Sequence, residues 1–297
     1  MKTIPDPLSN KHTARRTRLL WVLALWLAAG TTAWATHIVG AEIGYKCLGG
    51  NQYQITLTVY RDCNAGSAPF DNPAHVAIYN PNSGLVKELK IYNPVIEELD
   101  AVFNDPCLFV PEYVCVERAV YTTTTTLFPA TGGYTIVYQR CCRNETITNI
   151  VNPLETGATY EVELTEEAMA LCNSTPVFNQ IPPIFICIGK PIDYQHFATD
   201  PDGDSLVYRL CTPLTGGSLD DPQPIPPGPP PYDSIVWAPG FSVNDMLGNP
   251  DDPLTIDPVT GQLTGFPGQQ GTFVVGVCVE EYRNGQLLST VRRDFQY

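Results

Sequence analysis

Apolar and polar residues alternate one by one along several stretches of this chain. Between residues 53 and 59, a tyrosine, an isoleucine, a leucine and a valine are separated by glutamine and threonine. The same alternation returns at 134–139 and at 159–164. Because successive side chains of a strand point to opposite faces, a period of two places all the apolar residues on one face. Each stretch therefore predicts a half-buried β-strand.

The second half of the chain has the same character. Its strand candidates are 184–188, 206–211, 235–237, 273–280 and 287–297. Asn284-Gly285 lies between the last two, and this dipeptide is the strongest short signal for a hairpin. One short helix is expected at 165–171, with Thr165 as its N-cap. The pattern as a whole predicts an all-β protein.

A change of pattern at 173–183 indicates a domain boundary. Polar residues and Pro182-Pro183 interrupt the strands there. We therefore predict two β-sandwich domains, 36–178 and 179–297. The segment 221–231 holds seven prolines, which predicts a stiff, extended insertion loop over the sandwich. A proline-rich stretch can also serve as a docking ligand, and the loop interpretation is the favoured one.

The first 35 residues have the composition of a signal peptide. Basic residues precede an unbroken run of twelve apolar residues at 19–30, and Ala33-Trp34-Ala35 supplies a small-x-small cleavage site. A membrane-spanning helix needs about 20 such residues, so a cleaved signal is favoured over an uncleaved anchor. We expect the mature chain to begin at Thr36 and to keep no stable membrane span. Its expected location is extracellular or on the cell surface, associated with an outer membrane.

The charge of the chain excludes one class of partner. The full sequence has a formal net charge of −14. Removing residues 1–35 takes away five basic and one acidic side chain, which leaves 12 basic and 30 acidic residues and a net charge of about −18. Nucleic acid needs a basic footprint, so no nucleic-acid partner is expected. An acidic surface does attract divalent cations.

The ten cysteines all follow the predicted signal peptide. An even number of cysteines in an exported protein predicts up to five disulfides. Zinc is not expected, because the chain has no C-x-x-C pairs or Cys/His clusters of the required spacing. Cys141 and Cys142 are adjacent, and neighbours in a strand face opposite ways. We therefore expect these two to bond different partners.

Three carboxylates within five residues form the most specific candidate site. Asp200, Asp202 and Asp204 stand in a tight turn with Gly203. Calcium takes six to eight oxygen ligands, and such a turn can provide several of them. The alternative is an ordinary turn stabilised by aspartate side chains. Calcium is thus the one candidate cofactor, and Asp193 and Asp257 are candidate additional ligands.

The second half also resembles a known class of module. The acidic turn at 197–204, the segment 254–265 with its Ile-Asp-Pro-x-Thr-Gly-x-Leu-Thr-Gly pattern, and the closing strand at 271–279 follow one another in order. This order is similar to the immunoglobulin-like, cadherin- and dystroglycan-related modules of bacterial surface proteins. The resemblance implies that the domain 179–297 is immunoglobulin-like and serves spacing and adhesion. The insertion at 221–246 departs from those shorter modules.

The first half resembles the N-terminal region of large secreted proteins of Bacteroidota, many of which are gliding-motility-associated. The matching stretches are 36–42, 47–51, 55–63, 69–73 and 138–144. Such proteins usually continue well beyond this length. The resemblance therefore implies that this chain is the N-terminal part of a longer protein, or that its secretion follows another route.

Together these features predict a function without catalysis. A serine protease needs a serine beside a histidine that a carboxylate orients, and no such motif is recognisable. We predict a non-enzymatic, exported structural or adhesion module whose partners are cell-surface proteins or glycans. The rival hypothesis is a secreted polysaccharide-binding or polysaccharide-hydrolysing protein, in which Trp237 and scattered carboxylates form a cleft.

Overall fold

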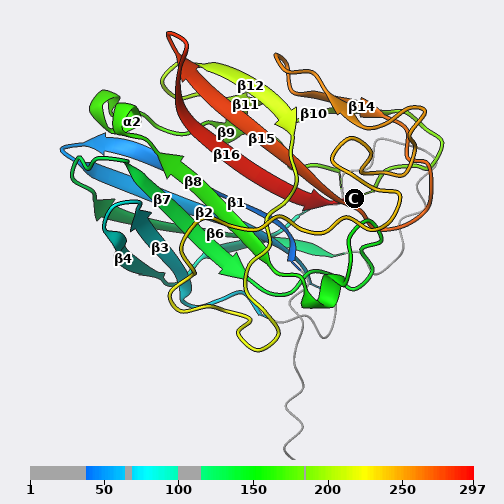
Figure 1. Cartoon of the computed structure of the whole chain (residues 1–297), viewed down its shortest axis with the longest axis horizontal. Coiled ribbons are helices and arrows are strands. Elements are labelled where there is room, and N and C mark those ends of the chain that lie inside the picture. Colours follow the sequence, from blue (N-terminus) through cyan, green and yellow to red (C-terminus); the bar gives the residue numbers. More distant parts are fainter. Residues whose placement is uncertain (1–37, 64–68, 100–114, 184) are drawn as a thin grey trace, which may run out of the picture. The chain divides into compact units, whose positions relative to one another are not determined.

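Antiparallel β-strands make up nearly all the regular structure of this protein (Figure 1). The computed structural model describes residues 38–63, 69–99, 115–183 and 185–297. The predicted signal peptide at 1–35 lies outside the described residues. The strands are β1 (Ile38–Gly49), β2 (Gln52–Asp62), β3 (Ala74–Asn80), β4 (Gly84–Ile91), β5 (Val95–Glu98), β6 (Val116–Thr126), β7 (Tyr134–Arg140), β8 (Ala158–Leu164), β9 (Val177–Phe178), β10 (Ile192–Gln195), β11 (Ala198–Thr199), β12 (Ser205–Leu210), β13 (Thr255–Ile256), β14 (Gln262–Gly265), β15 (Val274–Arg283) and β16 (Gln286–Gln296). The predicted all-β fold class is confirmed.

One large sheet joins strands from both ends of the chain. Its order is β4-β3-β7-β8-β16-β1-β2-β6-β5, with β15 paired to β16 and β12 paired to β15. The sheet curls, so that β4 approaches β6 and Lys87 Nζ lies 2.7 Å from Thr125 Oγ1. Two smaller sheets accompany it, β10-β14-β13 and β11-β9.

The last strand crosses the predicted domain boundary. Within β16, Phe295 pairs with Gly40 of β1, and Val291 pairs with Val162 of β8. Strands of the predicted second domain therefore hydrogen-bond to strands of the predicted first domain. The division at 178/179 stays a prediction, and Ala35–Tyr297 forms one compact unit.

The alternating stretches behave as their pattern predicts. In β2, Tyr53, Ile55 and Leu57 are at most 2% exposed, and they pack in the main core with side chains from β1, β6 and β8. The Asn284-Gly285 hairpin is present between β15 and β16, where Asn284 has φ 54° and Gly285 has φ 80°. Positive φ at both central residues is what such a turn requires.

The expected helix is also present. Helix α2 (Glu166–Leu171) begins at the predicted N-cap, where Thr165 Oγ1 accepts a hydrogen bond from the backbone N–H of Ala168 at 3.1 Å. It ends at Cys172, which is bonded to Cys47 of β1. The disulfide fixes the end of the helix to the first strand.

Two expected strands are absent. Residues 185–188 and 235–237 form no strand, although Trp237 makes an isolated bridge with Ile150. Ile186 and Trp237 instead pack on a second core, which contains Phe273 and Leu263. Their apolar character reflects burial by packing, and periodicity cannot distinguish this from burial in a sheet.

Three further disulfides lie within the described residues: Cys63–Cys115, Cys141–Cys142 and Cys211–Cys278. The expectation that Cys141 and Cys142 bond different partners is wrong. It assumed that both lie in a strand, but β7 ends at Arg140. The peptide between the two cysteines is cis, and their Cα atoms are 3.0 Å apart. The alternation of strand side chains does not apply there.

The proline-rich segment 221–231 lies against β3 and β7. The backbone N–H of Gly228 donates to Gln139 Oε1 at 2.7 Å, and Tyr79 donates to the carbonyl of Pro227. Arg140 Nη1 donates to the carbonyl of Pro222 at 3.0 Å. These contacts occupy backbone carbonyls that a docking ligand would present to a partner.

A buried ion pair ties the segment after β7 to β16. Arg143 Nη2 lies 2.7 Å from Asp294 Oδ2, and the two side chains are 4% and 6% exposed. The guanidinium also donates to the carbonyls of Gly157 and Leu214, each at 3.1 Å. Removing the arginine would leave the aspartate charged and buried.

We expect Arg143→Met to lower the free energy of unfolding by about 3–5 kcal/mol, because breaking a buried pair leaves an uncompensated charge. Arg209→Met is the matched control. Arg209 pairs with Glu280 at 2.7 Å, but its side chain is 44% exposed, so a loss of about 0–1 kcal/mol is expected. Urea unfolding monitored by fluorescence measures both. Equal losses in the two variants would contradict the prediction.

Candidate functional site

The acidic turn joins β11 to β12. Asp200 follows β11 directly, and its Oδ1 accepts hydrogen bonds from the backbone N–H groups of Asp202 at 2.9 Å and of Asp204 at 2.8 Å. Gly203 has φ 83°, a conformation that favours glycine. The side chain of Asp200 therefore stabilises the turn through Oδ1, and Oδ2 takes no part in these hydrogen bonds.

Strand β15 brings a third carboxylate to this turn. One oxygen each of Asp200, Asp202 and Glu281 lies within 4.8 Å of the others. Glu281 reaches the turn because β12 pairs with β15, with Leu206 opposite Glu281. Its side chain is fully buried. The sequence alone did not predict this ligand, since no local pattern links Glu281 to the turn and only the pairing of β12 with β15 brings it there.

Each carboxylate of this carboxylate cluster (Asp200, Asp202, Glu281) has one oxygen engaged by the protein. Asp202 Oδ2 accepts from the backbone N–H of Ser174 at 2.6 Å, and Glu281 Oε2 accepts from Ser289 Oγ at 2.5 Å. Among the described residues, Asp200 Oδ2 and Glu281 Oε1 are buried and have no hydrogen-bond partner. Burial raises the pKa of Glu281 to about 8, and the nearby Asp200 carboxylate contributes to the rise.

The dimensions of the cluster fit a calcium ion. Calcium–oxygen bonds of about 2.3–2.6 Å allow two ligands of one ion to lie up to about 5 Å apart. A divalent ion would also supply the missing partner of the two buried oxygens, which are costly to leave unpaired. The three carboxylates are hard oxygen donors, which suit calcium better than transition metals.

The other predicted ligands have different partners. Asp204 forms a bidentate pair with Arg283, with Nε–Oδ1 and Nη2–Oδ2 both at 2.6 Å. This hydrogen-bonded arginine lowers the pKa of Asp204. Asp193 accepts from Gln262 Nε2, and Asp257 Oδ1 accepts from the backbone N–H of Thr260 at 2.7 Å. Asp204 therefore flanks the cluster, and the remaining two aspartates lie outside it.

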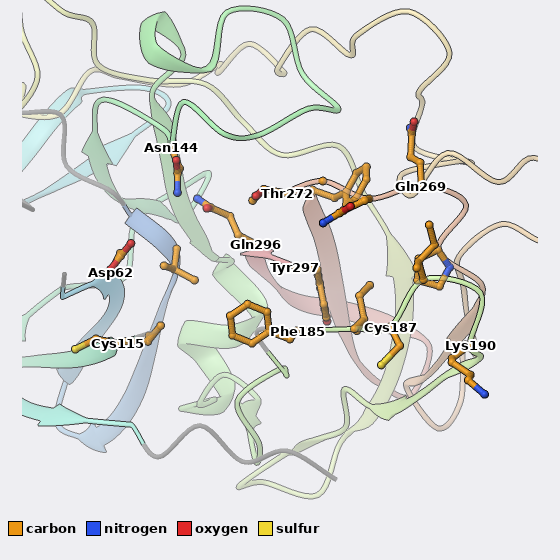
Figure 2. A pocket seen from close by; sticks show the side chains of 18 residues that line it. Asp62, Cys115, Asn144, Phe185, Cys187, Lys190, Gln269, Thr272, Gln296 and Tyr297 are labelled. Atoms are coloured by element: carbon orange, nitrogen blue, oxygen red, sulfur yellow. The ribbon is translucent and has the colours of Figure 1, made fainter. Parts of the chain in front are cut away.

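A cavity of about 590 Å³ lies near the opposite end of β15 (Figure 2). It opens between the segments 185–190 and 267–273, beside the start of β1 and the end of β16. The described residues that line it are Val39, Asp62, Cys115, Val116, Asn144, Phe185, Ile186, Cys187, Ile188, Lys190, Pro267, Gln269, Gln270, Gly271, Thr272, Phe273, Gln296 and Tyr297. Its size falls in the range of about 300–1,000 Å³ that is typical of small-molecule sites.

Two histidines lie in the part of the chain that the structure describes. His75 Nδ1 lies 2.8 Å from Glu88 Oε1, and His196 Nε2 lies 3.0 Å from the hydroxyl of Tyr297. His37 lies outside the described residues. Trp237 packs against two hydrophobic clusters and does not line the cavity.

The chain matches no protein-family model, no curated protein and no solved structure. The resemblance to secreted proteins of Bacteroidota and to immunoglobulin-like modules therefore stays a prediction. Over the part of the chain that the structure describes, no helix is long and apolar enough to cross a membrane.

His196 gives the fold a dependence on pH. Its side chain is 2% exposed, and its Nδ1 has no hydrogen-bond partner among the described residues. Burial lowers the pKa of His196 well below its usual range, and the charge of Arg293 adds to this effect. The unfolded chain binds a proton at this residue below about pH 6.5, whereas the folded chain does not.

We expect the contribution of His196 to stability to be present above pH 6.5 and to be lost as the pH falls, at about 1.4 kcal/mol per pH unit. His196→Gln should reduce the fall in the free energy of unfolding between pH 7 and 5. Tyr297→Phe, the control, removes the same hydrogen bond but keeps the imidazole, so its pH dependence should match the wild type. An unchanged slope in His196→Gln would contradict this account.

Proposed function

We propose that this protein is a non-enzymatic, exported structural or adhesion module of the cell surface. In this proposal it is extracellular or associated with the outer membrane, and it forms the N-terminal part of a longer, gliding-motility-associated protein. Its partners are cell-surface proteins or glycans. The disulfides support export, because disulfides persist in oxidising compartments.

The observation that carries the proposal is the carboxylate cluster. A fully buried glutamate faces two aspartates of a surface turn, and two of their oxygens have no partner among the described residues. In the apo protein at neutral pH, burial and repulsion from Asp200 keep Glu281 largely protonated, as its pKa of about 8 indicates. We infer that calcium occupies the cluster outside the cell and offsets this repulsion.

In this role calcium would fasten three segments together. Asp200 and Asp202 belong to the turn, Glu281 belongs to β15, and Asp202 also holds the backbone of Ser174. The neighbouring Thr175 bonds to the backbone of Tyr45 in β1, with N···O 2.9 Å. The ion would thus stiffen the connection between the N-terminal strands and the C-terminal hairpin.

We expect 10 mM calcium to stabilise the protein by about 1.4–2.7 kcal/mol relative to EDTA, if the dissociation constant lies in the 10⁻⁴–10⁻³ M range of extracellular modules. For a protein of this size the melting temperature should rise by roughly 3–10 °C. Glu281→Gln and Asp202→Asn should abolish the rise, which differential scanning calorimetry measures.

Asp257→Asn is the matched control, because Asp257 stabilises a different turn, which lies outside the carboxylate cluster. It should keep the full response to calcium. Magnesium at equal ionic strength controls for screening of the acidic surface. An equal melting temperature in EDTA and in calcium would remove calcium from the proposal. A loss of the response in Asp257→Asn alone would place the ion at a different turn.

Export is tested by the state of the cysteines in the native cell. We expect protein isolated without reductant to be labelled by thiol-alkylating reagents only after chemical reduction, and antibodies to label it on intact cells or in the medium. The expectation follows from the pairing of cysteines in the described residues. Fully reduced protein confined to the cytoplasmic fraction would overturn the proposed location.

A further inference from the structure

The cavity in Figure 2 combines an apolar floor with a polar lining in which primary amides outnumber charged side chains among the described residues. Val39, Val116, Phe273 and Tyr297 form the floor and are at most 7% exposed. Neighbouring strands hold these side chains rigidly, since Phe273 and Tyr297 exchange two backbone hydrogen bonds of 2.8 Å. A ligand that enters the cavity would therefore contact apolar side chains whose positions are already fixed.

The polar lining is dominated by primary amides. Asn144, Gln269, Gln270 and Gln296 all border the cavity, together with the hydroxyl of Thr272. An amide both donates and accepts hydrogen bonds and carries no charge. Gln296 is buried, and its Nε2 is anchored to the carbonyl of Ile38. This side chain is therefore preorganised at the edge of the floor.

The charges of the cavity do not select an ion. Asp62 and Lys190 are its only charged side chains among the described lining residues, and they lie on opposite sides in Figure 2. The whole chain is strongly acidic, with a net charge of −14, which disfavours an anionic ligand. A wholly apolar ligand is also disfavoured, because it would cover the amides without giving them hydrogen-bond partners.

We propose that this cavity binds a short, neutral saccharide. The C–H faces of a sugar ring suit the aromatic and aliphatic floor, including the ring of Phe185, and its hydroxyl groups suit the amides. Hydrolysis of a glycosidic bond needs two carboxyl groups across the sugar, whereas Asp62 is the only carboxylate in the described lining. The inference is thus one of binding without cleavage, and it is independent of the calcium cluster.

The test uses the purified protein on a printed array of neutral and acidic oligosaccharides. We expect retention of neutral glycans, and titration calorimetry with the best-retained neutral oligosaccharide should then give the affinity. Phe185→Ala should weaken that affinity by about tenfold, the effect of removing one aromatic contact surface. Phe185→Tyr should restore most of it. Gln270→Ala, at an exposed rim position where folding is not at risk, should weaken binding several-fold.

Phe128→Ala is the matched control. Phe128 is 68% exposed and follows the far end of β6, whereas Val116 at the start of β6 lines the cavity. Unchanged affinity in Phe128→Ala supports the proposal. No retained glycan, retention of acidic glycans only, or equal affinity in wild type, Phe185→Ala and Gln270→Ala would overturn it. Release of a shortened sugar on prolonged incubation would also overturn it, in favour of hydrolysis.

Discussion

The antiparallel pairing of the last hairpin with the first strands is the interaction on which the rest of the structure depends. Strand β16 hydrogen-bonds to β1, β8 and β15, so the sheet is continuous only when the two ends of the chain have met. Contacts between residues so far apart in sequence form late and slowly, because their loop-closure entropy must be overcome first. The disulfide between Cys47 and Cys172 lowers this entropy cost, because it shortens the length of chain that separates β1 from β16.

Buried charges accompany the meeting of the chain ends. Arg143 pairs with Asp294, and Arg293 pairs with Glu42 while its guanidinium carbon lies 3.9 Å from the ring centre of Phe178. Both pairs join β16 to residues that precede the predicted domain boundary. An ion pair of this kind adds little net stability compared with apolar packing, but a mispaired register would leave each charge alone in the core. The pairs therefore favour one register of β16 over its alternatives.

The same hairpin positions the two candidate sites. Glu281 lies near the end of β15, and Phe273 immediately precedes its start. A strand advances about 3.3 Å per residue, so the carboxylate cluster and the cavity are separated by roughly 25 Å along one strand. An ion at the first site and a neutral ligand at the second would not contact each other. Any coupling between them would pass through the rigid hairpin itself.

Local sequence determined the strands with a clear alternation, such as β2, β7 and β8, the helix with its N-cap at Thr165, and the turn at Asn284-Gly285, because period and turn chemistry depend on neighbouring residues. It also determined the position of the acidic turn, where the side chain of Asp200 accepts hydrogen bonds from the backbone of Asp202 and Asp204. The tertiary structure decided which carboxylates meet. Glu281 lies 81 positions from Asp200 and joins it only through the register of β12 against β15, while Arg283 of the same strand removes Asp204 from the cluster. The cavity was equally invisible in the sequence, since its described lining comes from seven separate segments. The alternation of apolar and polar residues shows which face of a strand is buried. Only the register of distant strands decides which residues that face packs against.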